Sequence, residues 1–166
     1  MKQEYFDGQA YFGNLAEKNK IVRRDGYKVG TCSGASGVEE VINNFRKVAN
    51  FILVDDTTNG NVFVNRAGGA FNRRTFTVFI IKHYKNMDMA DYEQKMTEVR
   101  LLYMQFLSRI LRDAQQLQLK DIYVDTNNIY YREPGPFAFN GAAGVYFMLS
   151  IDEPTDLIYD DEQWTE

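Results

Sequence analysis

The sequence predicts an α+β fold in which a mixed or antiparallel sheet of about four to six strands is covered by two main helices. Residues 75–84, TFTVFIIKHY, combine β-branched and aromatic side chains, which is typical of a strand. Residues 36–50 and 89–119 carry apolar side chains at helical spacing. Short apolar segments bounded by turn residues supply the remaining strands.

The chain length and composition indicate one compact domain. The 166 residues include 45% hydrophobic and 25% charged residues, which excludes a chain disordered throughout. We expect an N-terminal extension over 1–35 that packs on the body or reaches a partner, a core domain over 36–151 and an acidic tail over 152–166. A helix over 9–19 and a short strand over 27–29 fit within the extension.

The first main helix is expected to begin at Ser36. Ser36 and Glu39 have the spacing of a capping box, in which each side chain satisfies a backbone N–H. One apolar face follows at helical spacing, made of Val38, Val41, Ile42, Phe45 and Val48. The helix is expected to end near Asn50, before a short strand over 51–55.

The middle of the chain is expected to hold a hairpin and a central strand. Asn59-Gly60 favours a type I′ turn, which requires positive φ at both central residues, and 62–64 then form the returning strand. Residues 65–74 are expected to be a Gly-rich basic loop. Both faces of 75–84 are apolar, which places this strand inside the sheet.

The second main helix is expected over 89–119, with Asp88 as its cap. Its apolar residues recur every three or four positions, at Tyr92, Met96, Val99, Tyr103, Phe106, Ile110, Ala114 and Leu117. Such a stripe predicts a core or sheet-covering helix.

The closing segment is expected to form a hairpin and a final strand. Residues 122–125 and 129–132 flank a hairpin-like turn at 126–128. Residues 145–151 alternate, so that Val145, Phe147, Leu149 and Ile151 share one face and Tyr146, Met148 and Ser150 the other. This pattern suits a sheet with one face under a helix and the other exposed or at an interface.

Residues 30–34 fit the Gly-x-nucleophile-x-Gly pattern, with Cys32 in the nucleophile position. The only histidine, His83, together with Asp55 or Asp56, would complete a Cys/His hydrolase. The alternative is a loop that leads to the helix at Ser36, which we favour because such spacing arises easily by chance. Residues 55–60 begin like a calcium loop, but its twelfth position is Arg66 instead of Glu. We therefore predict no catalytic, cofactor or metal residues and no enzyme activity.

The charge is unevenly distributed. The net charge is −4, yet 152–166 contain seven acidic residues and no base, so the remainder carries +3. No strong basic stripe exists, and we expect no direct nucleic-acid binding. The basic loop has two readings, a phosphate site or a contact with an acidic neighbour surface, and we favour contact with the acidic tail of another subunit. The expected interface residues are Arg66, Arg73, Arg74, Tyr146, Met148, Asp160, Asp161 and Trp164.

Four segments carry a resemblance to a known family: 36–54, 75–84, 89–119 and 129–151 (IYYREPGPFAFNGAAGVYFMLSI). Their order resembles the tail-terminator, or tail-completion, proteins of tailed bacteriophages and prophages. The resemblance implies a small α+β subunit that assembles into a homo-oligomeric ring at the end of a tail tube, with the tube and head-completion proteins as partners and no catalytic residues. Residues 1–35 and the acidic tail depart from the family pattern.

Two further function classes stay open beside the assembly protein. One is a small-molecule or peptide-binding α+β module that uses the aromatic C-terminal segment, and the other is the Cys/His hydrolase. The longest apolar run has five residues, so no membrane segment is expected. A single cysteine and the absence of a leader pattern indicate the cytoplasm before assembly, and the virion if the protein is phage-derived.

Overall fold

The predicted α+β class is confirmed by a computed structural model that describes residues 5–44, 50–85, 87–136, 138–139 and 141–165. The helices are α1 (Gly8–Lys18), α2 (Lys20–Arg24), α3 (Gly34–Asn44), α4 (Met89–Gln118) and the short 3-10 helix η1 (Asp161–Gln163). The strands are β1 (Lys28–Cys32), β2 (Asn50–Asp55), β3 (Asn59–Val64), β4 (Ala70–His83), β5 (Tyr123–Val124), β6 (Tyr130–Arg132) and β7 (Ala142–Pro154).

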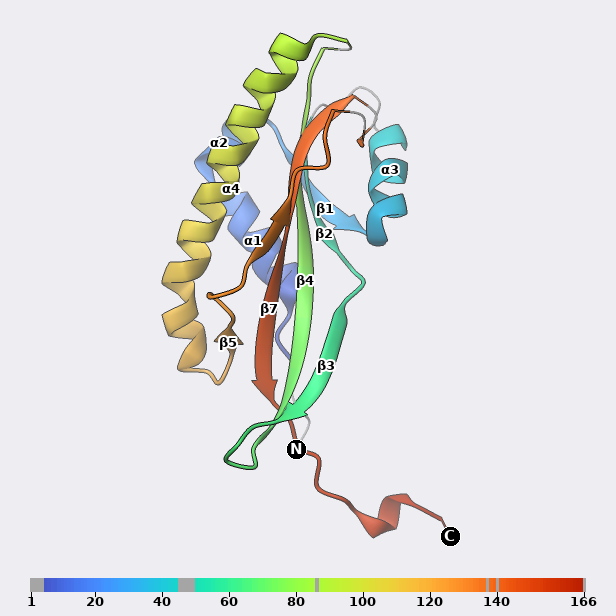
Figure 1. Ribbon diagram of the computed structural model, residues 1–166, viewed down its shortest axis with the longest axis vertical. Helices are drawn as coiled ribbons and strands as arrows, with labels where there is room; N and C mark the ends of the chain where they lie inside the picture. The colour runs from blue at the N-terminus through green and yellow to red at the C-terminus, as the bar shows by residue number, and fades with distance from the viewer. Residues whose placement is uncertain (1–4, 45–49, 86, 137, 140, 166) are drawn as a thin grey trace.

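Within the described part of the chain, seven strands form one mixed sheet, more than the four to six predicted. Its order is β1-β2-β4-β7-β5, with β3 also pairing with β4 and β6 also pairing with β7. β1 and β2 are parallel and the other pairs are antiparallel. β4 and β7, the two longest strands, pair over thirteen positions and form the centre of the sheet (Figure 1).

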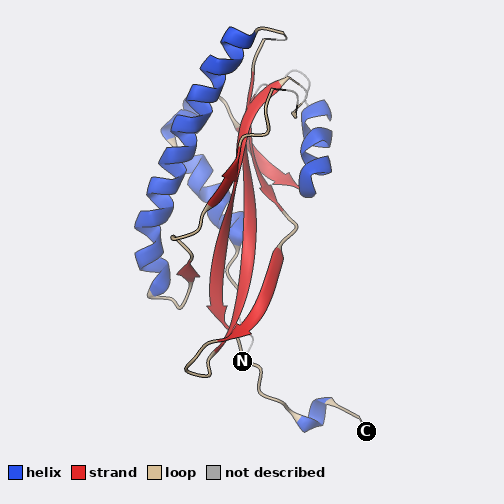
Figure 2. Cartoon of the chain, in the orientation of Figure 1, coloured by secondary structure: helices blue, strands red, loops and turns tan. Residues whose placement is uncertain are grey.

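The helices divide unequally between the two faces of this sheet. α1, α2 and α4 lie on one face, and α3 lies on the other (Figures 1 and 2). The main core forms beneath the first group, where Phe12, Phe106 and Phe147 are completely buried. A smaller core beneath α3 contains Val38 and Phe79.

Both predicted main helices are present, as α3 and α4, but among the described residues only α4 is long. α3 begins at Gly34, so Ser36 lies inside the helix and is not its cap. Its first turn is held by Asp55, whose Oδ1 accepts a hydrogen bond from the Gly34 N–H at 3.0 Å. At the other end, Asn50 belongs to β2. The last expected turn of this helix, residues 45–49, lies outside the described residues.

The predicted Asn59-Gly60 turn is also wrong. Both residues lie in β3, which pairs with β4 and not with β2. Gly60 is required for a different reason, since a Cβ atom there would lie 2.4 Å from the Arg73 carbonyl oxygen. The glycine is therefore needed for the close approach of two strand backbones, and in the sequence it cannot be distinguished from a turn glycine.

The predicted basic loop over 65–74 is shorter than expected. β4 begins at Ala70, so the turn occupies only 65–69, and Arg73 and Arg74 are strand residues. Thr75 continues the same strand. Arg73 and Arg74 form ion pairs with acidic residues of β7, so this polar segment can remain in the sheet.

The predicted hairpin over 122–132 is replaced by two short strands that both pair with β7. β7 is longer than predicted and includes Asp152 and Glu153, the first two acids of the expected tail. The predicted alternation is confirmed, since Phe147, Leu149 and Ile151 are buried in the main core and Met148 is half-buried on the opposite face.

The N-terminal segment packs into the body. Phe6, Phe12 and Ala16 lie in the main core, and β1 forms one edge of the sheet. Asp7 caps α1 by accepting a hydrogen bond from the Ala10 N–H at 2.9 Å.

Candidate functional site

On the face that bears α3, no helix of the described residues covers the other half of the sheet (Figure 2). We call it the open sheet face. Because side chains alternate along each strand, the register assigns its members. They include Phe63, Phe71, Arg73, Thr75, Thr77, Tyr123, Tyr130, Met148, Ser150 and Asp152. Of these only Tyr130 is exposed and the others are half-buried, whereas Asn61 and Arg132, which share the face by the same register, are exposed. This face therefore offers a broad aromatic and polar surface.

The rings of the open sheet face are ordered by contacts with one another. Phe63 stacks on Phe71 at 5.7 Å between ring centroids, and Tyr123 meets Phe71 edge-on at 6.0 Å. The Arg73 guanidinium lies 5.6 Å from the centre of the Phe63 ring. The surface is therefore preformed, which lowers the entropy lost on docking a partner.

Arg73 and Arg74 point to opposite faces of the sheet. On the open face, Arg73 pairs with Asp152, with Nε at 2.6 Å from Oδ1 and a second bond at 2.8 Å. On the helical face, Arg74 donates to Glu153 at 2.7 and 3.0 Å and to the Phe6 carbonyl oxygen at 2.6 Å.

These ion pairs change the expected interface. The predicted contact joined this basic segment to the acidic tail of a neighbouring subunit. For Arg73 and Arg74 the acidic partners belong to the same chain, because β7 continues as a strand through Pro154. Arg66 differs from both, since it lies exposed in the turn at 65–69.

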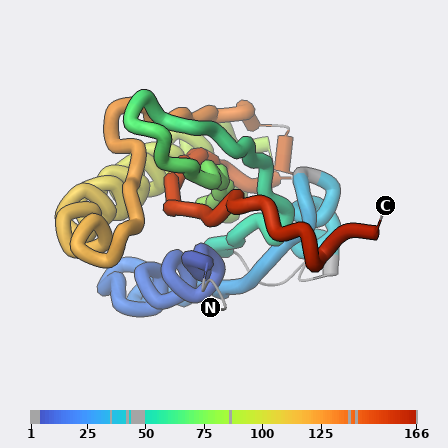
Figure 3. The backbone as a smooth tube through the Cα atoms, turned by 90° about the horizontal axis from the view of Figure 1, so that it is seen from below, coloured from blue at the N-terminus to red at the C-terminus, as the bar shows by residue number. Residues whose placement is uncertain are grey.

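The remainder of the tail leaves the domain after Thr155, whose N–H donates to the Ala70 carbonyl at 3.0 Å. We call residues 156–165 the arm. Figures 1 and 3 show the arm extending away from the body on the side of α3. Its four large apolar side chains are 59 to 84% exposed: Leu157, Ile158, Tyr159 and Trp164.

The arm has local order despite its exposure. Tyr159 and Trp164 stack at 6.3 Å between ring centroids. Asp160 caps η1 by accepting a hydrogen bond from the Glu162 N–H at 3.1 Å, and Asp161 is the first residue of that helix. The predicted interface residues therefore lie on two different parts of the fold. Asp160, Asp161 and Trp164 belong to the projecting arm, whereas Tyr146 and Met148 belong to β7 within the sheet.

The Cys/His pair expected for a hydrolase does not form. The strand, turn and helix required by the pattern are present, as β1, Ser33 and α3. However, Cys32 pairs with Asp55 at one end of β2, whereas Lys82, next to His83, pairs with Asn50 at the other end. Five residues of strand separate these ends, about 16 Å at 3.3 Å per residue.

The Cys32 thiol is also unsuited to nucleophilic attack. Burial, together with the nearby Asp55 and Asp56 carboxylates, raises the pKa of Cys32 to about 12. Asp55 and Asp56 are used in local structure: Asp55 Oδ1 accepts from the Thr57 N–H and hydroxyl, and Asp56 accepts from the Ser33 hydroxyl at 2.7 Å. A thiol with so high a pKa is protonated at neutral pH.

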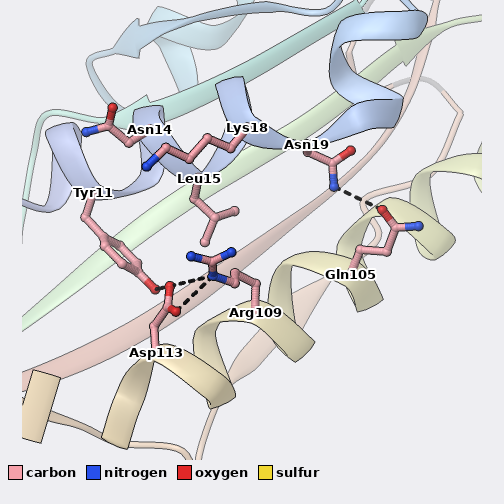
Figure 4. Close-up of a pocket in the computed structure, with 8 residues that line it drawn as sticks. All are labelled: Tyr11, Asn14, Leu15, Lys18, Asn19, Gln105, Arg109 and Asp113. Atoms are coloured by element: carbon pink, nitrogen blue, oxygen red, sulfur yellow. Dashed lines mark hydrogen bonds and ion pairs between the residues drawn. The ribbon is translucent and has the colours of Figure 1, made fainter. Parts of the chain in front are cut away.

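A groove that sequence analysis did not predict lies between α1 and α4 (Figure 4). It encloses about 230 Å³ and is lined by Tyr11, Asn14, Leu15, Lys18, Asn19, Gln105, Arg109 and Asp113. Asp113 accepts hydrogen bonds from the Tyr11 hydroxyl at 3.2 Å and from Arg109 Nε at 2.9 Å. Burial and the Asp113 charge raise the pKa of Tyr11, so the phenol remains a hydrogen-bond donor.

A partly buried ion cluster joins the end of α2, β4 and α4. Lys82 donates to Asp25 at 2.8 Å and lies 2.5 Å from a Glu98 oxygen. Burial alone would lower the pKa of Lys82, but its hydrogen bonds to these two carboxylates raise it overall. Because each charge has a partner within the chain, we assign this cluster to stability and not to ligand binding.

Comparison with known proteins gives no relative: no family model matches the chain, and no curated protein matches it. Among the described residues, no helix is long and apolar enough to span a membrane. The described part of the chain also contains no cluster of three or more His, Cys, Asp or Glu side chains placed to bind a metal ion.

Proposed function

We propose that this protein is a structural assembly subunit, similar to a phage tail terminator, which acts by forming a homo-oligomeric ring at the end of a tail tube. The observation that carries the proposal is the arm, which exposes four large apolar side chains on a segment detached from its own domain. Exposed apolar groups of this size are typical of interaction segments. The tube and head-completion proteins would then be its further partners.

The open sheet face of a neighbouring copy is the receptor that fits the arm. The arm brings an apolar and aromatic surface, and the open face presents Phe63, Phe71 and Tyr123 as a preformed ring cluster. A contact between two different surfaces of identical subunits is heterologous, and such contacts generate rings when the rotation closes. The same two surfaces would then be buried in every subunit.

Charge complementarity supports this pairing. Asp156, Asp160, Asp161 and Glu162 give the arm four acids and no base. Arg66 and Arg132 are exposed beside the open sheet face, in the turn at 65–69 and on β6. Pairing between exposed charges is weakened by salt, so the assembly is expected to be salt-sensitive.

Light scattering after size exclusion tests the proposal. The full chain should form an oligomer of several subunits at high concentration and low salt. Deletion of 156–166 should abolish this oligomer, and it leaves the Asp152 and Glu153 ion pairs intact. An exposed apolar substitution outside the arm, Met87→Ser, serves as the matched control and should leave the mass unchanged. An unchanged oligomer after the deletion would refute the assignment of the arm.

A second candidate function rests on the groove between α1 and α4. Its lining of amide, phenol, lysine and arginine groups suits a small polar molecule, and its volume of about 230 Å³ is small for a drug-sized ligand. A thermal-shift screen with small carboxylates and sugars tests this binding module. A ligand that stabilises the full chain but not the Tyr11→Phe variant would favour the module over the assembly protein.

A further inference from the structure

α4 carries an apolar stripe on one side and an uncharged, partly apolar stripe on the other. The inner stripe covers the sheet and includes Val99, Phe106 and Ile110, which are completely buried. The opposite side carries a second stripe, the outer seam, at Thr97, Leu101, Met104, Ser108, Leu111 and Gln115. These residues follow one another at alternating spacings of four and three, which is the heptad pattern of paired helices.

The outer seam is uncovered in the described chain. Leu101 and Met104 are each 60% exposed, and Leu111 is 49% exposed. No seam residue is charged, although the centre of the exposed face of a solvated helix ordinarily carries charges. Leu101, Met104 and Leu111 are apolar, Thr97, Ser108 and Gln115 are polar but uncharged, and such a row at heptad spacing favours a helix–helix contact.

We propose that the outer seam packs against the outer seam of a second copy, with the two α4 helices antiparallel. The flanking charges select this orientation. In the antiparallel register centred near position 106, Glu98 of each copy lies close to Arg112 of the other. In a parallel pair, Glu93 would instead face Glu98 of the second copy, and the like charges would repel.

The proposed pair is self-complementary. Leu101 faces Leu111 of the second copy, and Met104 faces Ser108, so each contact occurs twice. Glu98 already pairs with Lys82 and Lys95 of its own chain, and 34% of its side chain remains exposed for Arg112. From Thr97 to Gln115 the seam extends about 27 Å at 1.5 Å per residue.

This contact goes beyond the ring and does not depend on the arm. The ring uses a heterologous contact between the arm and the open sheet face, whereas the outer seam gives an isologous pair. If both operate, two rings join back to back through α4. The seam itself carries no charge and only its flanks do, so its dimer should persist at salt concentrations that dissociate the arm.

Cross-linking tests the pairing and its direction. In a Cys32→Ala background, chains with Met104→Cys are mixed with chains with Ser108→Cys and mildly oxidised. We expect a disulfide-linked dimer from the mixture and much less from either chain alone. Efficient cross-linking of Ser108→Cys with itself would indicate a parallel pair and overturn the proposal, as would the absence of any dimer.

Sedimentation of the otherwise unmodified chain gives an independent test. Met104→Glu should weaken dimerisation by about a hundredfold, because two charges are introduced into each interface. The matched control is Met87→Glu, since Met87 is 83% exposed and lies outside α4. Deletion of 156–166 should leave the seam dimer intact. If that deletion removes it as fully as Met104→Glu, the arm covers the seam and the proposal is wrong.

Discussion

The two faces of the sheet differ in how completely the chain covers them. Phe147 and Met148 are neighbours on β7, yet Phe147 is completely buried beneath α4 and Met148 is half-buried on the open sheet face. Among the described helices, α1, α2 and α4 cover one face, whereas α3 lies over one end of the other (Figure 1). The fold is therefore stabilised mainly from one side, which leaves the other side free for contacts between molecules.

The largest expected difference in stability between the two faces is at the neighbouring residues Phe147 and Met148 of β7. Phe147→Ala removes a ring that contacts Phe12 and Tyr103, and it should lower the free energy of unfolding by about 3–5 kcal/mol. Met148→Ala should cost about 1 kcal/mol or less in the monomer. Urea titration measures both. Equal losses would show that the open face is as well packed as the covered face.

Arg74 and Arg73 of β4 form ion pairs on the covered face and on the open sheet face, respectively. Arg74→Ala leaves the Glu153 carboxylate, which is 5% exposed, without its guanidinium, and should cost about 2–3 kcal/mol. Arg73→Ala removes a pair from the open sheet face, where the Arg73 side chain is 36% exposed, and should cost about 1 kcal/mol or less. The reverse order in urea titrations would contradict this assignment of the faces.

Acid should weaken the covered face through Asp25. Hydrogen bonds from Arg24 and Lys82 lower the pKa of Asp25 from 3.8 to about 2, despite its partial burial. A depressed folded-state pKa stabilises the protein above about pH 4, and this contribution is lost as the pH falls from 4 to 2. We expect a loss of about 1–2 kcal/mol after solvent screening. Urea titrations at pH 5 and pH 2 measure this loss. In the Asp25→Asn variant, the difference in the free energy of unfolding between the two pH values should be about 1–2 kcal/mol smaller than in the unmodified chain.

The smallest expected effect belongs to the open sheet face. Thr75 and Ser150 share a hydrogen bond of 2.8 Å between their hydroxyls. Ser150→Ala should cost only about 0.5–1 kcal/mol, because water can satisfy the remaining Thr75 hydroxyl. A loss above 2 kcal/mol in thermal unfolding of the monomer would indicate that this face is far better shielded than its exposure implies.

The local pattern of the sequence determined much of the covered face. The α+β class, α4 and the alternation of β7 follow from apolar spacing, because a stripe that must be buried repeats every 3.6 or 2 residues. The same spacing identifies the outer seam, although a stripe in sequence does not reveal what covers it. Asp88 was correctly expected to cap α4, since its side chain accepts from the Asp91 N–H.

Only the tertiary structure decided the partners of these elements. Asn59-Gly60 suggested a turn, but the approach of the Arg73 carbonyl explains the glycine within β3. The pairing of Arg73 and Arg74 with Asp152 and Glu153 depends on a strand register between residues 79 positions apart. Cys32 and His83 can be paired from the sequence pattern alone, but in the fold they lie beside opposite ends of β2. Local chemistry fixes periodicity, while register and long-range packing decide which side chains meet.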